Sequence, residues 1–359
     1  MEIKVELNQN LKSKAVLEKG ELPFGHIFTD YMFVMDYAPD KGWHNAKITP
    51  YAPLMLDPST SCLHYGQMFF EGMKAYKRTD GQIAMFRPME NMHRMNLSAQ
   101  RMSMPEINPD EVLEGLEKLV ALEKDWIPST PESSLYIRPF MIGMDALLGL
   151  RPSSTYKFII ILSPVGAYYG KDGLAPVRIF VESEYVRAVR GGTGYAKCAG
   201  NYAGSMLSQL NAQGHGFNQV LWLDGIHRKY VEEVGAMNVF FLVDDTVITP
   251  ALSGSILPGI TRKSIIEICK DWGLKVEERP VAIDELAKAY DDGKLKEAFG
   301  SGTAAVISPI GELTWGDKVM KLAEGKPGQL TQRIYDEITG IQYGANPDTR
   351  DWVKIVSHN

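Results

Sequence analysis

The chain has 359 residues, of which 45% are hydrophobic and 23% are charged, a composition typical of globular proteins. Its formal net charge is −6, and it carries no basic patch of the kind that binds nucleic acid. No stretch approaches the ~18 apolar residues of a membrane span, and the charged N-terminus lacks the apolar core of a signal peptide.

Length and cysteine content narrow the class further. A typical domain has about 150 residues, so about two domains are expected. Cys62, Cys198 and Cys269 are odd in number and far apart, which favours free thiols in a reducing compartment, the cytoplasm. The seven histidines are scattered and no Cys/His spacing indicates zinc, so no metal site is predicted.

The N-terminal half is expected to combine strands with two helices. Apolar runs predict three strands, at 28–36, 135–142 and 156–162. The segment 75–86 is interrupted by Thr79-Asp80-Gly81 and predicts a hairpin. One helix is expected from Pro88, and another from Pro109, where Asn108 can cap the helix.

A stretch rich in glycine and proline is predicted to separate the two domains. It includes Gly170, Gly173 and Pro176, residue types that interrupt regular structure. We therefore predict a smaller N-terminal α/β domain at 1–166, a linker at 167–176 and a larger C-terminal domain at 177–359.

The C-terminal half combines hairpins with helices. Hairpins are expected over 219–233 and 238–249, and a strand at 295–299 is expected to end at the turn 300–303. The predicted helices are 202–213 with a cap at Gly214, one from Gly259 to Gly273, one from Ile283 and one at 329–339. Because strands and helices mix without a regular βαβ alternation, the predicted fold class is α+β.

A glycine-rich stretch, 191–204, surrounds a single lysine, Lys197, with five glycines. Glycine tolerates positive φ and close backbone approach, so this density indicates either a solvent loop or a backbone shaped around a ligand. In the first case Lys197 is an ordinary exposed lysine. In the second it is held against an aldehyde cofactor, whose ring hydroxyl, ring nitrogen and phosphate then need partners.

Two residues are candidates for the ring of such a cofactor. Tyr202 follows Lys197 by five residues and could bond the ring hydroxyl. Glu233 ends a strand before an apolar, glycine-containing turn, where an unpaired carboxylate is costly, and could face the ring nitrogen. Taken alone, the first residue also fits a core tyrosine and the second an exposed acid at a strand end.

Three features could hold the phosphate. The helix start at Ile260-Thr261 points free amides and a helix dipole outward. The glycine-rich turn that ends at Thr303 can present more amides, and Arg94 can add a bidentate contact. Taken alone, the helix start is more typical of a helix that binds no ligand, and Arg94 is more typical of a surface arginine.

Short segments of this sequence, in their order along the chain, resemble those of the branched-chain amino acid aminotransferases, which are pyridoxal-phosphate enzymes of fold type IV. The matching blocks are 24–30 (FGHIFTD), 64–65 (HY), 70–76 (FEGMKAY), 134–139 (SLYIRP), 163–168 (SPVGAY), Lys197 with 200–202 (GNY), 233–238 (EVGAMN), 257–262 (LPGITR) and 299–304 (FGSGTA). The resemblance implies two α/β domains with pyridoxal 5'-phosphate at their interface.

The resemblance also assigns roles, with Lys197 as the Schiff-base lysine and proton shuttle. The implied cofactor-binding residues are Arg94, Lys197, Tyr202, Glu233, Ile260 through its amide, Thr261 and Thr303. The implied substrate-binding residues are Phe24, Phe70, Tyr136, Arg138, Tyr168, Ala236 and Ala304. Tyr65, Leu148 and Leu150 are implied to enter from the other subunit of a homodimer.

The implied activity is a ping-pong transfer of the amino group of L-leucine, L-isoleucine or L-valine to 2-oxoglutarate, in biosynthesis or degradation of these amino acids. A D-amino acid aminotransferase or an aminodeoxychorismate lyase of the same fold is an alternative. So is a non-catalytic protein that binds a phosphate ligand. Three positions depart from some relatives. Ala305 and Ser308 replace a Cys-x-x-Cys pair, so no thiol switch is expected there, and Ala236 replaces threonine.

Overall fold

A computed structural model of the chain describes residues 1–18, 22–166, 174–323 and 325–357. The chain divides into two compact units. The first unit comprises Met1–Tyr168, Ala196–Ala199 and Gly340–Asn359, and the second Tyr169–Tyr195 and Gly200–Thr339. Residues 167–173 of the predicted linker, Tyr168 among them, lie outside the described ranges.

The first unit is built on a nine-stranded sheet with the order β1-β3-β2-β8-β7-β5-β6-β18, and β4 pairs with β7 beside that path. Its strands are β1 (Lys4–Val5), β2 (Tyr31–Ala38), β3 (Gly42–Pro50), β4 (Met68–Phe70), β5 (Met73–Lys77), β6 (Ile83–Phe86), β7 (Ser134–Gly143), β8 (Tyr156–Val165) and β18 (Val353–Ile355). The pairing is antiparallel except between β1 and β3. Four strands of this sheet have no counterpart among the predicted elements: the short strands β1, β4 and β18, and the longer β3.

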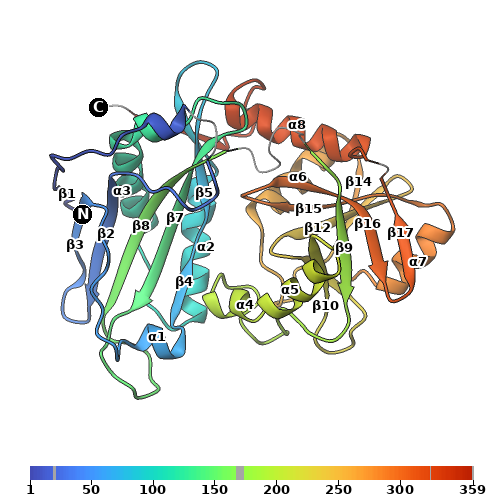
Figure 1. Cartoon of the computed structure of the whole chain (residues 1–359), viewed down its shortest axis with the longest axis horizontal. Coiled ribbons are helices and arrows are strands. Elements are labelled where there is room, and N and C mark those ends of the chain that lie inside the picture. The colour runs from blue at the N-terminus through green and yellow to red at the C-terminus, as the bar shows by residue number, and fades with distance from the viewer. Residues whose placement is uncertain (19–21, 167–173, 324, 358–359) are drawn as a thin grey trace. The chain divides into compact units, whose positions relative to one another are not determined.

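Alternation along β7 separates a core face from a polar face. Leu135 and Ile137 belong to the main hydrophobic core with the buried faces of α2 (Pro88–Arg101) and α3 (Pro109–Leu122). Figure 1 shows both helices beside the strands of this sheet. Because strand side chains alternate, Tyr136 and Arg138 point to the opposite face. The predicted cap of α3 is confirmed, since the Asn108 side chain accepts the amides of the first turn. A short helix, α1 (Ser61–Tyr65), precedes β4.

The second unit contains another nine-stranded sheet, β11-β10-β9-β16-β15-β12-β13-β14, with β17 paired to β16. Its strands are β9 (Val177–Glu182), β10 (Gln219–Leu223), β11 (Val231–Val234), β12 (Asn238–Val243), β13 (Thr246–Thr249), β14 (Lys275–Glu278), β15 (Leu295–Gly302), β16 (Val306–Trp315) and β17 (Lys318–Lys321). Both predicted hairpins, β10 with β11 and β12 with β13, are confirmed.

The helices of the C-terminal half are α4 (Ala199–Ala203), α5 (Met206–Gly214), α6 (Ile260–Asp271), α7 (Ile283–Asp291) and α8 (Gln329–Tyr343). The single helix predicted over 202–213 is wrong, because Ser205 breaks it: its amide and hydroxyl both bond to the Tyr202 carbonyl, at 3.1 and 2.7 Å. The predicted cap at Gly214 is also wrong. The helix includes that residue, and the left-handed backbone falls on Gly216, with φ +81.

The turn predicted at 300–303 begins later. Strand β15 continues to Gly302 because Gly300 and Ser301 remain paired with Val239 and Asn238 of β12. The chain turns only at 303–305, before β16. The glycines therefore belong to a strand, where an added Cβ on Gly300 would meet Val234 and Met237 side chains at 2.9 Å.

A buried acid makes the stability of the first unit depend on pH. Glu123 is 2% exposed and accepts the Tyr31 amide at 2.5 Å. Burial, helped by the charge of nearby Asp30, raises the pKa of Glu123 to about 7. A raised carboxyl pKa favours the protonated form, so the stability it contributes is complete below about 4.5 and is lost as the pH rises through about 7.

We expect Glu123→Gln to remove this dependence, because the amide imitates the protonated acid and can still accept the Tyr31 amide. Urea denaturation should give similar free energies of unfolding for both proteins at pH 5. At pH 8 the variant should be more stable by about 3 kcal/mol. Glu114→Gln, at an exposed position of α3, is the control and should show no such change between pH 5 and pH 8. A Glu123→Gln variant that is less stable than the parent at pH 8 would contradict the assignment.

Candidate active site

The predicted catalytic lysine is attached to the first unit through its backbone. The Lys197 carbonyl accepts the Phe70 amide at 3.1 Å, and the Lys197 amide donates to Ser98 Oγ at 2.9 Å. Cys198 forms a β-bridge with Phe69, so this short segment extends the edge of β4. The side chain is half-buried, and its Nζ lies 5.0 Å from the centre of the Phe70 ring. Lys197 is therefore held at both backbone polar groups and is not part of a solvent loop.

A buried ion pair lies beside the lysine. Arg94 of α2 contacts Glu71 with two nitrogens, Nε to Oε1 at 2.6 Å and Nη2 to Oε2 at 2.9 Å. Glu71 has no exposed surface and Arg94 is 8% exposed. Burial opposes ionisation of Glu71, but the charges of Arg94 and Lys197 outweigh it and lower the pKa of this carboxyl. The Glu71 carboxylate therefore offsets part of the positive charge of Arg94 and Lys197.

Aromatic rings and one guanidinium cover the polar face of β7 next to this pair. The rings of Phe24 and Tyr136 meet edge to face, with centroids 4.8 Å apart. The Arg138 guanidinium lies 4.7 Å from the Phe70 ring centre and donates to the Tyr136 hydroxyl at 3.2 Å. Among the described residues, the buried Nε of Arg138 has no hydrogen-bond partner. Four predicted substrate residues, Phe24, Phe70, Tyr136 and Arg138, are thus brought together.

Three other predicted substrate residues lie apart from these, in an exposed part of the first unit. Tyr65 ends α1 and is 41% exposed, and its hydroxyl donates to the Leu148 carbonyl. Leu148 and Leu150 are 61% and 84% exposed. The structure therefore joins Tyr65 to the segment that carries both leucines. Tyr168 lies outside the described residues.

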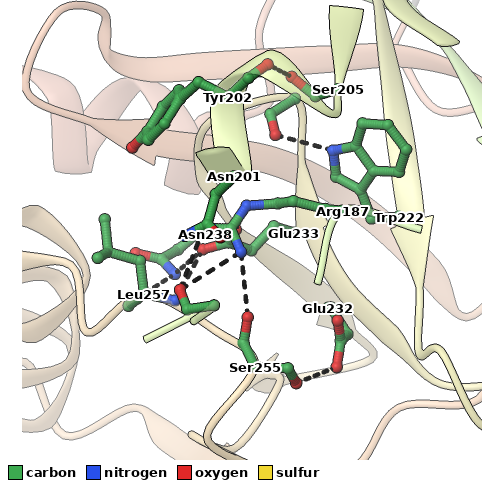
Figure 2. A network of polar contacts seen from close by, with 12 residues as sticks. Arg187, Asn201, Tyr202, Ser205, Trp222, Glu232, Glu233, Asn238, Ser255 and Leu257 are labelled. Carbon is green, nitrogen blue, oxygen red and sulfur yellow. Dashed lines mark hydrogen bonds and ion pairs between the residues drawn. The ribbon is translucent and has the colours of Figure 1, made fainter. Parts of the chain in front are cut away.

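In the second unit, a network of polar contacts surrounds the buried Glu233 of β11 (Figure 2). Its carboxylate lies 2.5 Å from Nε of Arg187. It also accepts the Leu257 amide at 3.1 Å and the Asn238 side-chain amide at 3.3 Å. A cation and two amide donors favour the ionised form of a buried acid, so the site holds a fixed anion here.

Arg187 is itself held in place by carbonyl groups. Its guanidinium donates to the Ser255 carbonyl at 3.1 Å and to the Gly194 carbonyl at 3.3 and 3.4 Å. The Ser255 hydroxyl in turn bonds to Glu232, the buried neighbour of Glu233 (Figure 2). Burial raises the pKa of Glu232. The two adjacent acids thus face different partners, a hydroxyl for Glu232 and an arginine for Glu233.

Asn238 connects this acid to the start of helix α6 and to the end of β15. Its side-chain amide also donates to the Leu257 carbonyl at 2.9 Å, and it pairs in register with Ser301. A Cβ on Gly259, the residue before α6, would lie 1.9 Å from the Asn238 side-chain oxygen, so only glycine fits. Glu233, the residues just before α6 and the end of β15 therefore lie around Asn238.

The predicted residues around this point differ in exposure. Ile260, Thr261, Thr303 and Ala304 are half-buried, and Ala236 is exposed in the turn after β11. That turn is fixed by Trp222, whose indole donates to the Gly235 carbonyl at 2.9 Å (Figure 2). Tyr202 is half-buried on α4, and the next turn of chain is bonded to its carbonyl.

Comparison with known proteins shows the family to which this chain belongs. A family model described as "Amino-transferase class IV" matches residues 68–313, more than half of the chain. The chain belongs to this family. Among class IV relatives, the branched-chain-amino-acid aminotransferase 2 of Bacillus subtilis (strain 168) is 55% identical over 99% of this chain and 97% of that protein. The branched-chain-amino-acid aminotransferase of Mycolicibacterium smegmatis is 46% identical, over 98% of each chain.

Solved structures resemble this class IV aminotransferase over most of its length. The branched-chain amino acid aminotransferase from Escherichia coli has a TM-score of 0.74 at 27% identity, covering 91% of this chain and 99% of that one. The T.th. branched-chain amino acid aminotransferase with pyridoxamine 5'-phosphate has a TM-score of 0.76 at 26% identity, covering 91% and 98%. The predicted α+β fold of type IV is confirmed. Across the described ranges, no helix of this aminotransferase is long and apolar enough to cross a membrane.

Three site residues of this class IV aminotransferase were missed by the sequence analysis as functional groups. Glu71 and Asn238 stand inside matching blocks, but nothing in their spacing reveals that they pair with Arg94 and with the start of α6. Arg187 lies ten residues before Lys197 and outside every block. A buried partner for Glu233 was nevertheless to be expected, because a carboxylate next to an apolar turn needs a counter-charge.

Proposed function

We propose that this protein is a branched-chain amino acid aminotransferase that moves the amino group of L-leucine, L-isoleucine or L-valine to 2-oxoglutarate by a ping-pong mechanism. The 55% identity to the Bacillus subtilis enzyme over nearly the whole chain supports this activity. The observation that carries the proposal is the convergence of a fixed anion, Glu233, and a helix N-terminus, the start of α6, on Asn238. A phosphorylated pyridine cofactor needs these two kinds of group.

Pyridoxal 5'-phosphate suits the residues present. Glu233 is an acid partner for the ring nitrogen, and Arg187 keeps it ionised. The first amides of α6, at Ile260 and Thr261, have no acceptor within the helix and suit a phosphate. We propose that Thr303 and Arg94 complete the phosphate site and that Tyr202 bonds the ring hydroxyl.

When bound, pyridoxal 5'-phosphate supplies an aldehyde carbon that carries the amino group and a ring that withdraws electrons from the substrate's Cα. We propose that the Lys197 ε-amine holds the cofactor and takes the proton from Cα. Its anchored backbone, bonded to Phe70 and Ser98, limits the movement of the amine to its own side-chain torsions. Beside the lysine, Glu71 and Arg94 form a fixed ion pair whose charges cancel.

The substrate residues fit a pocket that accepts both aliphatic and acidic side chains. We propose that the rings of Phe24, Phe70 and Tyr136 contact the aliphatic side chain of a branched-chain amino acid. The Arg138 guanidinium then offers its unsatisfied Nε and the rest of its donors to a carboxylate. Ala236, Ala304 and Tyr168 remain proposed substrate residues.

We propose a homodimer as the active form, in which Tyr65, Leu148 and Leu150 line the substrate pocket of the partner copy. Their exposure in the single chain supports this proposal. We also propose a cytoplasmic location, which the three free and buried cysteines support. Sedimentation of the purified holoenzyme should give the mass of a dimer, and a fully active monomer would contradict the assignment of these three residues.

A donor panel tests the proposed activity. With 2-oxoglutarate as acceptor, the holoenzyme should convert L-leucine, L-isoleucine and L-valine at kcat/KM values at least about 100-fold above that for D-alanine. A preference for D-alanine would favour the D-amino acid aminotransferase alternative. A protein that stays colourless after addition of pyridoxal 5'-phosphate and has no activity would favour a non-catalytic binding protein.

A further inference from the structure

The segment between β7 and β8, residues 144–155, presents two leucines to solvent from a base that is tightly bonded. Leu148 and Leu150 are 61% and 84% exposed, and Leu63 and Tyr65 of α1 are 58% and 41% exposed. We refer to residues 144–155 together with α1 as the arm. The exposed side chains are apolar, and the loop that carries them is held by hydrogen bonds. Such a loop is preorganised to bury these side chains against another surface.

One carboxylate closes the base of the arm. Asp145 accepts the Thr155 amide at 2.9 Å and the Thr155 hydroxyl at 2.6 Å. It also accepts the amide and the hydroxyl of Ser154, both at 3.0 Å, and pairs with Arg151 at 3.0 Å. Against the effect of its burial, the hydrogen bonds from Ser154 and Thr155 hold the pKa of Asp145 well below its usual range. The chain leaving β7 and the chain entering β8 are thus joined by a group that only accepts hydrogen bonds.

Further bonds join the segment to α1. The Asp145 carbonyl accepts the Ser61 amide at 2.9 Å, and the Ser61 and Ser153 hydroxyls are 2.6 Å apart. At the other end of α1, the Tyr65 hydroxyl donates to the Leu148 carbonyl. The two leucines and the tyrosine therefore belong to one hydrogen-bonded unit, the arm. Asp145 contacts both the 151–155 part of the loop and, through its carbonyl, α1.

We propose that Asp145 is a positioning residue that fixes Leu148 and Leu150 in the geometry in which they meet substrate in a second copy of this chain. The proposal rests on the proposed function, which places both leucines in the partner's pocket. Without Asp145, the segment would have to be ordered again whenever substrate binds, and the entropy lost in that step would weaken binding. Because the leucines are apolar, the effect should fall on branched-chain substrates.

The test compares Asp145→Asn with the double variant Leu148→Ala/Leu150→Ala and with the triple variant, all as holoenzymes. The asparagine is isosteric but brings an amide donor to face the amides and hydroxyls that Asp145 accepts. We expect Asp145→Asn to raise the KM for L-leucine about tenfold, with kcat changed less than about threefold and the absorption of the bound cofactor retained. The triple variant should have the KM of the double variant, because Asp145 acts through the leucines.

The outcomes separate this proposal from the proposed function. If the double variant raises KM and Asp145→Asn does not, the positioning role is wrong and the pocket assignment stands. The positioning role is also wrong if Asp145→Asn raises the KM of the double variant by the same factor by which it raises the KM of the parent enzyme. If the double variant leaves KM unchanged, the assignment of the leucines to the pocket is wrong, whatever Asp145 does.

Two further variants keep the test decisive. Asp348→Asn, in a turn of the first unit where the acid accepts the Val353 and Arg350 amides, is a matched control that should leave KM unchanged. Thr155→Val removes only the hydroxyl bonded to Asp145 and substitutes for Asp145→Asn if that variant does not fold. It should raise the KM for L-leucine about twofold to threefold, and an unchanged KM would overturn the proposal.

Discussion

Lys197→Ala should lower kcat for transamination of L-leucine on the order of 10⁴-fold or more, because it removes both the amine that holds the cofactor and the base at Cα. The backbone bonds of this position to Phe70 and Ser98 do not involve the side chain, so the fold should be unaffected. Cofactor binding should persist in part, since Glu233, the start of α6 and the other proposed contacts remain. Steady-state rates and the visible spectrum of the bound cofactor measure the two effects separately.

Chemical labelling provides a second readout for this prediction. Borohydride reduction of the parent holoenzyme, followed by peptide mass analysis, should place the cofactor on the peptide that contains Lys197. Lys270→Ala, an exposed lysine on α6, is the control and should keep both the label and the rate. A label on any other lysine, or an active Lys197→Ala enzyme, would refute the proposed role.

Glu233→Gln should reduce kcat on the order of 10²- to 10³-fold, because a neutral amide no longer stabilises a positive charge on the cofactor's ring nitrogen. The substitution keeps an oxygen that can accept the Leu257 amide. It also leaves Arg187 beside a neutral group, so the variant's thermal stability should fall. The measurements are kcat, the melting temperature and the pH dependence of the cofactor's absorption, which reports the charge on the ring.

The adjacent acid gives a matched control. Glu232 is also buried on β11, but its carboxylate bonds to the Ser255 hydroxyl, whereas Arg187 pairs with Glu233 (Figure 2). Because Glu232 bonds to a hydroxyl and is not the acid that pairs with Arg187, Glu232→Gln should change kcat and the spectrum very little. Equal losses from both substitutions would mean that the whole network, and not the charge of Glu233, supports the activity.

Much of the local structure followed from the sequence because its signals are local. Asn108 and Pro109 define a helix start through side-chain and backbone geometry within one turn. The hairpins at Asp224 and Asp244 depend on a turn of a few residues between apolar runs. The errors arose where a side chain competes with the helix for a backbone hydrogen bond, which the sequence pattern does not reveal. The Ser205 hydroxyl, which bonds to the Tyr202 carbonyl where α4 ends, is an example.

The sequence by itself determined the family, because the matching segments occur in a specific order, and the same segments led to the proposed roles of the lysine and the acid. Only the tertiary structure decided which groups meet: Arg94 with Glu71, Arg187 with Glu233, Asn238 with the start of α6, and Tyr65 with Leu148. These contacts join residues between 19 and 83 positions apart in the chain. Side-chain partners at such separations depend on strand register and packing, which no local pattern contains.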